Sequence, residues 1–345
     1  MTSFSWPKTL ATLLAREPLS EEDSSAAMAE IMEGAATPAQ IAGFVVALRA
    51  KGETSPELSG LVRTMRRYAQ RIDVDGDLLD TCGTGGDRAG TFNVSTAAAL
   101  VCAGAGAKVA KHGNRAASSR CGSADVLEAL GVHIALPPHA VAACIEQAGM
   151  GFCFAPVFHP AMRHAAAPRR ELGVATIFNF LGPLTNPAGA RFQALGVSDR
   201  RMMELMVETL GRLGSVHVVA FHGDRGLDEL STSGPSEVIE LCDGAVRRWT
   251  LDPGELGLEP SSLSSVAGGT AEENAAAIRA VLDGEGGARR DIVALNAAAG
   301  LVAAGRAQDV AQGLAQAAEA IDSGAAGNVL DRLIATSTGL APSQE

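Results

Sequence analysis

The pattern of apolar residues predicts a helical segment at the start of the chain, over residues 1–72. Apolar side chains recur there every three or four positions, as they do on one face of a helix. One such run places four of them together: Ile41, Phe44, Val45 and Leu48. Thr37-Pro38 and Ser55-Pro56 each combine an N-cap residue with a proline, which is typical of a helix start. We therefore expect a small, all-helical N-terminal domain.

From residue 73 the pattern changes to short apolar runs that alternate with longer helical ones. The strand candidates are residues 78–81, 108–110, 133–136, 194–197, 216–221 and 236–241. The helix candidates are residues 94–105, 124–130, 139–147 and 201–213, with further helix over about 291–334. Strands that alternate with helices are typical of a mostly parallel sheet with helices on its faces. The sequence thus predicts a larger α/β domain over residues 73–345.

A segment over about residues 160–190 interrupts this alternation with short helical runs and polar residues. Gly182-Pro183 and Asn186-Pro187 are turn signals within it. We expect its helices to pack against those of residues 1–72. The helical domain would then be discontinuous in sequence.

A glycine-rich turn follows the first predicted strand. Gly83, Gly85 and Gly86 precede Asp87, and a polar helix start with Asn93 and Ser95 comes shortly afterwards. Glycines allow several backbone N–H groups to point into one concavity, and the N-terminus of a helix adds partial positive charge. This arrangement favours an anion, and the sequence predicts a phosphate or pyrophosphate site.

A second polar cluster follows the strand predicted at 108–110. Residues 111–115 read Lys-His-Gly-Asn-Arg, and residues 118–123 add serines, an arginine and a glycine directly before a helix. Cationic side chains, hydroxyls and helix N–H groups all bind phosphate oxygens. An ordinary loop with a capped helix explains the cluster equally well when it is taken alone. Beside the glycine-rich turn, the phosphate interpretation is favoured.

Two adjacent carboxylates, Asp228 and Glu229, follow the apolar run at 216–221. Acids in a solvated loop are the ordinary explanation for such a pair. Next to a pyrophosphate they would also suit Mg²⁺, which prefers carboxylates, phosphate oxygens and water.

Composition and charge narrow the function classes. With 47% hydrophobic and 19% charged residues the chain is typical of a soluble globular protein. The net charge of −11 argues against general binding to nucleic acid or membranes. The six cysteines form no C-x-x-C pair, so we expect reduced thiols and a cytoplasmic location. The sequence contains no P-loop, H-E-x-x-H or G-x-S-x-G motif.

Taken together, the motifs resemble those of the anthranilate phosphoribosyltransferases. The matching blocks, in that family's order, are residues 83–87, 93–96, 111–115, 122–131, 170–173, 176–179, 181–184 and 226–229. The resemblance implies transfer of phosphoribose from 5-phosphoribosyl 1-pyrophosphate (PRPP) to the amine of anthranilate, in tryptophan biosynthesis. It also implies dependence on Mg²⁺, with two ions per active site, and a homodimer formed through the N-terminal helices.

The same resemblance assigns the site residues. The PRPP set would be Gly83, Gly86, Asp87, Thr91, Asn93, Val94, Ser95, Thr96, Lys111, His112, Gly113, Asn114, Arg115, Ala116, Ala117, Ser118, Ser119 and Ser123. The anthranilate set would be Gly83, Asn114 and Arg169, and the magnesium set Ser95 for one ion and Asp228 with Glu229 for the other. No residue is implied as a general base, and Lys111, Asn114 and Arg169 would act by charge and positioning.

Three positions depart from the family pattern, and two other functions stay open. Cys82 and Cys121 stand where apolar or small hydroxyl residues are usual, and Ala175 stands where many members have a larger or charged residue. The pyrimidine nucleoside phosphorylases share the fold and a similar glycine loop. A non-catalytic relative that binds nucleic acid is the other alternative, although the acidic charge and the intact set of candidate ligands argue against it.

Overall fold

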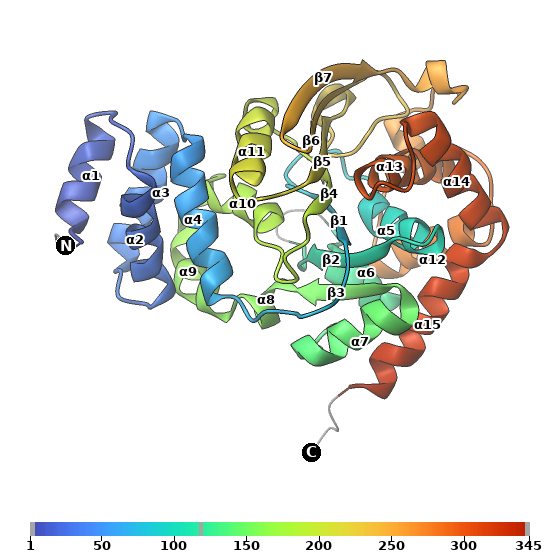
Figure 1. The fold of residues 1–345 in the computed structure, drawn as a ribbon, viewed down its shortest axis with the longest axis horizontal. Helices are drawn as coiled ribbons and strands as arrows, with labels where there is room; N and C mark the ends of the chain where they lie inside the picture. The colour runs from blue at the N-terminus through green and yellow to red at the C-terminus, as the bar shows by residue number, and fades with distance from the viewer. Residues whose placement is uncertain (1–3, 117–119, 342–345) are drawn as a thin grey trace.

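The computed structural model describes residues 4–116 and 120–341, which form a helical part and a larger α/β part (Figure 1). The N-terminal helices are α1 (Trp6–Leu14), α2 (Glu21–Met32), α3 (Pro38–Lys51) and α4 (Ser55–Tyr68). Thr37 caps α3 through a capping box with Gln40, as its Thr-Pro start predicts. The cap of α4 lies one residue earlier than expected, at Thr54, because its partner Glu57 is three residues further on.

Within the described residues, the sheet has seven strands in the order β3-β2-β1-β4-β5-β6-β7. The strands are β1 (Leu78–Gly83), β2 (Lys108–Gly113), β3 (Met150–Phe154), β4 (Phe192–Gly196), β5 (His217–His222), β6 (Ser236–Cys242) and β7 (Ala245–Leu251). β3, β2, β1, β4 and β5 are parallel, and β6 and β7 are antiparallel. The prediction of a mostly parallel sheet is confirmed.

Helices cover both faces of this sheet. They are α5 (Val94–Gly104), α6 (Ser123–Ala129), α7 (Pro138–Ala148), α11 (Arg200–Arg212), α12 (Ala271–Leu282), α13 (Ala288–Ala303), α14 (Val310–Asp322) and α15 (Ala325–Gly339). Successive residues of a strand point to opposite faces. Ala194 and Val219 therefore pack in one apolar cluster with α5 and α13, whereas Leu195 and Val218 pack in a second cluster with α11.

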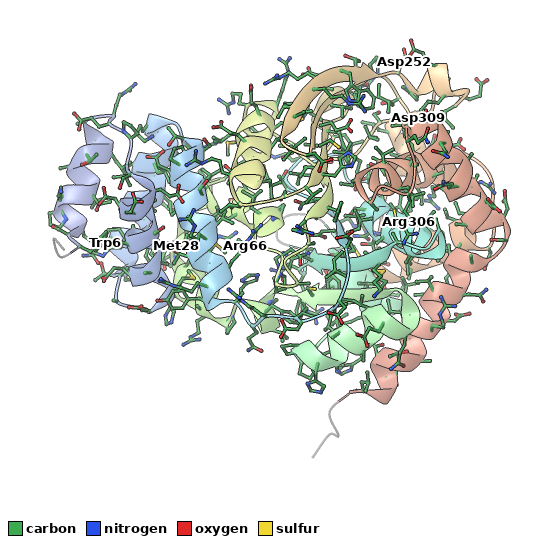
Figure 2. All side chains as sticks on the ribbon, viewed as in Figure 1. Trp6, Met28, Arg66, Asp252, Arg306 and Asp309 are labelled. Carbon is green, nitrogen blue, oxygen red and sulfur yellow. The ribbon has the colours of Figure 1, made fainter. Side chains whose placement is uncertain are left out.

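The segment between β3 and β4 packs against the N-terminal helices. It contains the short helices α8 (Ala155–Phe158), α9 (Arg163–Leu172) and α10 (Phe178–Leu181). Ala165 and Phe178 share an apolar cluster with Phe44 and with Trp6 and Met28, two side chains marked in Figure 2. Arg66 of α4, also marked there, donates from Nε to the Leu184 carbonyl (2.9 Å). The division of the chain at residue 72 stays a prediction.

The prediction of a strand over residues 133–136 is wrong. Val132, Ile134 and Leu136 are buried alternately, which produces the strand-like pattern. The backbone N–H of His133 donates to Ser337 Oγ of α15 (3.1 Å) and not to a neighbouring strand. The alternation thus reflects packing between helices.

Two strands escaped the sequence analysis for opposite reasons. All residues of β3 are buried, so its sequence shows no alternation of apolar and polar residues. Without that alternation, the segment directly after α7 is not recognised as a strand. β7 is an edge strand that is exposed along most of its length, so it lacks an apolar face. Separately, among the described helices none combines the length and apolarity needed to cross a membrane.

Candidate active site

The glycine-rich turn and the acid pair meet at the carboxyl ends of β1, β4 and β5. The backbone N–H of Gly85 donates to Asp228 Oδ2 (2.7 Å). Ser198, directly after β4, donates from its Oγ to the Gly85 carbonyl (2.7 Å), and its N–H donates to Thr84 Oγ1 (3.0 Å). Parallel strands bring their carboxyl ends to one edge of a sheet, which is where open α/β sheets bind ligands.

The acid loop, residues 223–230, approaches the two central strands so closely that it needs glycine there. Gly83 of β1 pairs with Gly196 of β4. A Cβ atom on Gly83 would overlap the Asp228 carboxylate, and one on Gly196 would overlap the Asp228 carbonyl oxygen. Glycine is therefore required at both positions for close approach of the loop.

The carboxylates at this edge are buried or half-buried, and few positive charges balance them. Burial, followed by the nearby charge of Asp87, raises the pKa of Asp228 to about 7. Burial and the charge of Asp228 raise the pKa of Glu229 well above its ordinary value, although Lys111 opposes this shift. Asp87 Oδ2 is buried and has no hydrogen-bond partner among the described residues. A divalent cation would relieve this excess of negative charge.

These carboxylate oxygens fit Mg²⁺ if other ligands complete its coordination. Within residues 4–116 and 120–341, no three carboxylate, imidazole or thiol groups converge closely enough to hold a metal by themselves. Mg²⁺ is commonly bound through one or two carboxylates together with phosphate oxygens and water. The residues therefore fit an ion that arrives with a phosphorylated substrate.

The start of α5 is held between the acid pair and Lys111. Glu229 Oε1 accepts the N–H of Ser95 (3.1 Å). The buried Lys111 ammonium donates to the Thr81 carbonyl and to Ser95 Oγ (3.3 Å). Burial lowers the pKa of Lys111, whereas the charges of Asp80 and Glu229 raise it. Lys111 thus lies beside the start of α5, close enough to Glu229 for their charges to interact.

Asn93 joins this helix start to the second polar loop. Its Nδ2 donates to the Cys121 carbonyl (3.3 Å), and its Oδ1 accepts from Asn274 Nδ2 of α12 (2.9 Å). Val94 and Thr96 follow it in α5 and are fully buried. Thr91 lies two residues before Asn93 and forms an isolated antiparallel bridge with Ala267.

The second loop is organised by one carboxylate, Asp125. Its Oδ2 accepts the N–H groups of Gly122 (2.8 Å) and Ala116 (3.0 Å). Its Oδ1 accepts from the Arg115 guanidinium (2.9 Å), which also donates to Glu128. Arg115 is therefore already paired with acids.

Further contacts close the second loop. Ser123 Oγ donates to the Asn114 carbonyl (3.3 Å), and Asn114 Oδ1 accepts the N–H of Arg115 (2.8 Å). Three of the residues predicted for this loop, Ala117, Ser118 and Ser119, lie outside the described part of the chain.

His112, at the end of β2, is a neutral buried imidazole. Burial lowers its pKa to about 3, and burial lowers that of His159 to about 4. Since a carbonyl oxygen only accepts, the contact of His112 Nδ1 with the Gly182 carbonyl (3.0 Å) places the ring proton on Nδ1. Nε2 is then an acceptor that is buried without a partner among the described residues. The next residue, Gly113, ends β2 against Ser123.

Arg169 lies in the last turn of α9, with its guanidinium over the ring of Phe178 at 5.4 Å from the centroid. Burial lowers its pKa. No carboxylate within the described ranges pairs with it, unlike Arg115. Arg169 is thus a partly desolvated cation that is available to an anionic ligand.

Comparison with known proteins identifies the family. The helical bundle domain of the glycosyl transferase family matches residues 7–69, and its a/b domain matches residues 75–327. An anthranilate phosphoribosyltransferase of Roseiflexus castenholzii is 56% identical over 322 residues, which are 93% of this chain and 95% of that protein. The chain belongs to the anthranilate phosphoribosyltransferase family.

Solved structures of the family have the same fold. The crystal structure of the Thermus thermophilus enzyme is 46% identical, with a TM-score of 0.90 over 96% of this chain and 99% of that one. The Saccharomyces cerevisiae enzyme, in complex with PRPP and Mg, is 28% identical, with a TM-score of 0.88 over 97% of this chain and 98% of that one. The resemblance found in the motifs is confirmed.

One departure from the pattern of the anthranilate phosphoribosyltransferases concerns the core. Cys82 belongs to the apolar cluster that includes α11 and the N-terminal helices, and its Sγ accepts from Gln193 Nε2 (3.0 Å). Burial raises its pKa well above the ordinary value, so the thiol is protonated. Cys82 therefore takes the place of an apolar residue without facing the glycine-rich turn.

Several residues to which the sequence assigned no role in the site support it through hydrogen bonds or close packing. Asp80 Oδ1 accepts the N–H of His112 (3.1 Å), and its Oδ2 accepts from Asn186 Nδ2 (2.8 Å). Burial raises the pKa of Asp80 to about 6. A carboxylate in an apolar strand is a signal that could have identified Asp80. No such signal marks Asn186, Ser198 or Gly196, because their contacts come from distant segments.

Proposed function

We propose that the protein transfers the phosphoribosyl group of PRPP to the amine of anthranilate. The products are N-(5-phosphoribosyl)anthranilate and pyrophosphate, and the reaction belongs to tryptophan biosynthesis. The observation that carries this proposal is the contact between the glycine-rich turn and the acid pair, beside a buried Asp87 oxygen to which no described residue donates a hydrogen bond. An anion cradle next to uncompensated carboxylates suits a pyrophosphate that binds together with a divalent cation.

The residues predicted for PRPP keep their roles in this proposal. Backbone N–H groups of residues 83–87 and of the α5 N-terminus would bind the pyrophosphate, and residues 111–123 would complete the site. Asn114 and Arg169 would bind anthranilate, since the unpaired Arg169 guanidinium suits its carboxylate.

We assign Mg²⁺ to two positions, one at Ser95 and one at Asp228 with Glu229. The relative from Saccharomyces cerevisiae was solved with PRPP and Mg, which supports this choice of ion. A bound Mg²⁺ would supply positive charge to the departing pyrophosphate.

The reaction needs positioning and charge more than acid–base chemistry. The amine of anthranilate is already a neutral nucleophile, so no covalent enzyme intermediate is required. As pyrophosphate leaves, negative charge grows on it, and the N–H groups of the turn and the Lys111 ammonium stabilise that charge. Arg169 and Asn114 hold the acceptor near the reacting carbon, which lowers the entropic part of the barrier.

The assay that tests this function follows the fluorescence of anthranilate. We expect fluorescence to fall only when protein, PRPP and Mg²⁺ are all present, because the amine is then converted to its phosphoribosyl derivative. Phosphate-dependent release of thymine or uracil from nucleosides would instead favour a nucleoside phosphorylase. If neither reaction occurs, the proposed catalytic function is wrong.

Replacing Arg169 by alanine is expected to raise the KM for anthranilate by roughly tenfold to a hundredfold with a smaller change in kcat, because a charge-assisted contact to the acceptor is lost. Steady-state kinetics with each substrate varied in turn measure this. Arg170→Ala is the matched control, since the neighbouring side chain is exposed. An unchanged anthranilate KM in Arg169→Ala would remove Arg169 from the acceptor site.

Oligomeric state and location are also part of the proposal. The proposal includes a homodimer through the N-terminal helices, where Leu14 (76%) and Val46 (44%) are exposed. Light scattering of the purified protein measures its mass in solution. The free cysteines among the described residues suit the reducing cytoplasm.

A further inference from the structure

A buried asparagine of α13, Asn296, binds the chain directly after the acid pair. Its Oδ1 accepts the N–H of Leu230 (2.8 Å), and its Nδ2 donates to the Leu230 carbonyl (3.0 Å) and to the Ile292 carbonyl (2.8 Å). Asn296 is 3% exposed and Leu230 is 1% exposed. Both backbone groups of the residue that follows Glu229 are therefore paired with one side chain.

The acid loop needs such an anchor because its own charges work against its position. Glu229 is buried and the half-buried Asp228 lies beside it near Asp87, and like charges at short range repel each other. The loop also contains Arg225 in the left-handed region (φ 59°), a conformation that is strained for a residue with a side chain. In the absence of a metal these effects favour displacement of the carboxylates.

The other contacts of the loop involve the acid side chains themselves. The carboxylates of Asp228 and Glu229 accept the N–H groups of Gly85 and Ser95. These contacts use the same oxygens that would bind the cation.

Two more contacts hold the ends of the loop. Before the acid pair, the N–H of Gly223 donates to the Leu227 carbonyl (2.8 Å). After it, the N–H of Ser231 donates to Oγ of Ser236, the first residue of β6 (3.0 Å). Asn296 is different, because it fixes the backbone of the residue next to Glu229 to a helix packed on the sheet.

We propose that Asn296 is a positioning residue for the reaction: it holds Asp228 and Glu229 where they bind the divalent cation that accompanies pyrophosphate. The proposal rests on the proposed function for the identity of the cation and the substrate. The side chain acts through Leu230 and touches no substrate. An amide suits this task because it presents one donor and one acceptor side by side, as a neighbouring strand would.

Asn296→Asp tests the anchor with little change in shape. The carboxylate can still accept the N–H of Leu230, but it cannot donate to the carbonyls of Leu230 and Ile292. The added negative charge alone would attract a cation more strongly, so weaker binding in a folded variant indicates displacement of the loop. Asn296→Leu, which is uncharged and removes all three hydrogen bonds, is the second variant.

The first measurement is Mn²⁺ binding in the presence of PRPP, followed by the EPR signal of free Mn²⁺. We expect both variants to bind Mn²⁺ roughly tenfold or more weakly than the wild type, since residues that orient metal ligands have effects of this size. Ser337→Ala is the control, because it removes a buried hydroxyl on α15 that accepts the N–H of His133, away from the acid loop. Wild-type affinity in both variants, or an equal loss in Ser337→Ala, would overturn the proposal.

The second measurement is hydrogen exchange in the metal-free wild type, which requires no variant and no turnover. A firmly anchored loop predicts slow exchange at the amide of Leu230, and rapid exchange there would contradict the proposal even if neither variant folds. These readouts also separate the two hypotheses. If the wild type fails to consume anthranilate while Asn296→Asp still weakens Mn²⁺ binding, the anchor stands and the proposed function falls.

Discussion

Replacing Asp228 by asparagine and Glu229 by glutamine together is expected to lower Mg²⁺-dependent turnover by roughly a thousandfold, or about 4 kcal/mol in the barrier. The amide oxygens can still accept the N–H groups of Gly85 and Ser95, so the loop keeps its contacts. What disappears is the negative charge that would hold the cation against the pyrophosphate. Steady-state rates measured across a range of Mg²⁺ concentrations report the loss.

The same double variant should be at least as stable as the wild type when metal is absent. Burial raises the pKa of both carboxyls, which means that their charged forms are unfavourable in the folded protein. Neutral amides avoid that cost, so we expect an unchanged or higher Tm in the presence of EDTA. Lost turnover with retained stability would separate a functional role from a structural one.

The matched control for the acid pair uses two acids in surface ion pairs outside the acid loop. Glu237 pairs with Arg200, and Glu204 pairs with Arg248. Glu204→Gln with Glu237→Gln removes the same number of charges, and we expect it to keep the wild-type response to Mg²⁺. A normal Mg²⁺ dependence in the Asp228, Glu229 variant would show that the metal assignment is wrong.

Local signals in the sequence were sufficient for most of the fold. The helix start at Thr37 depends on contacts within one turn, and α3 begins where those contacts form. β4 and β5 show apolar runs because each is buried in the middle of the sheet. Residues 133–136 were predicted as a strand because their alternate burial against helices produces the same pattern of apolar and polar residues.

The candidate site was predictable only as far as it is built from contiguous motifs. The turn around Gly83 and the pair Asp228 and Glu229 each follow a predicted strand, and parallel strands end at a common edge. Contacts that join separate segments leave no local pattern. Asn296 stands in an otherwise apolar run of α13, and the sequence does not show which group it contacts. The structure places it against Leu230.

Gly196 also contacts a distant segment, the acid loop. Its replacement by alanine is expected to lower kcat/KM at least a hundredfold. The residue ends β4, and a Cβ atom there would overlap the carbonyl oxygen of Asp228. Backbone cannot rotate away as the end of a flexible side chain can, so the acid loop must shift. A displacement of about 1 Å in a group that positions substrate can cost a factor of about a hundred.

Gly327→Ala is the control for Gly196→Ala, because it adds the same methyl group where the nearest atom, the carbonyl oxygen of Leu282, is 3.9 Å away. We expect Gly327→Ala to keep wild-type kinetics. The shift of the acid loop should also weaken Mn²⁺ binding in Gly196→Ala and speed hydrogen exchange at Leu230, as in the Asn296 variants, because both changes release the same loop. Wild-type activity in Gly196→Ala would mean that the reaction tolerates displacement of Asp228, and the assignment of this carboxylate to the metal would then have to be abandoned.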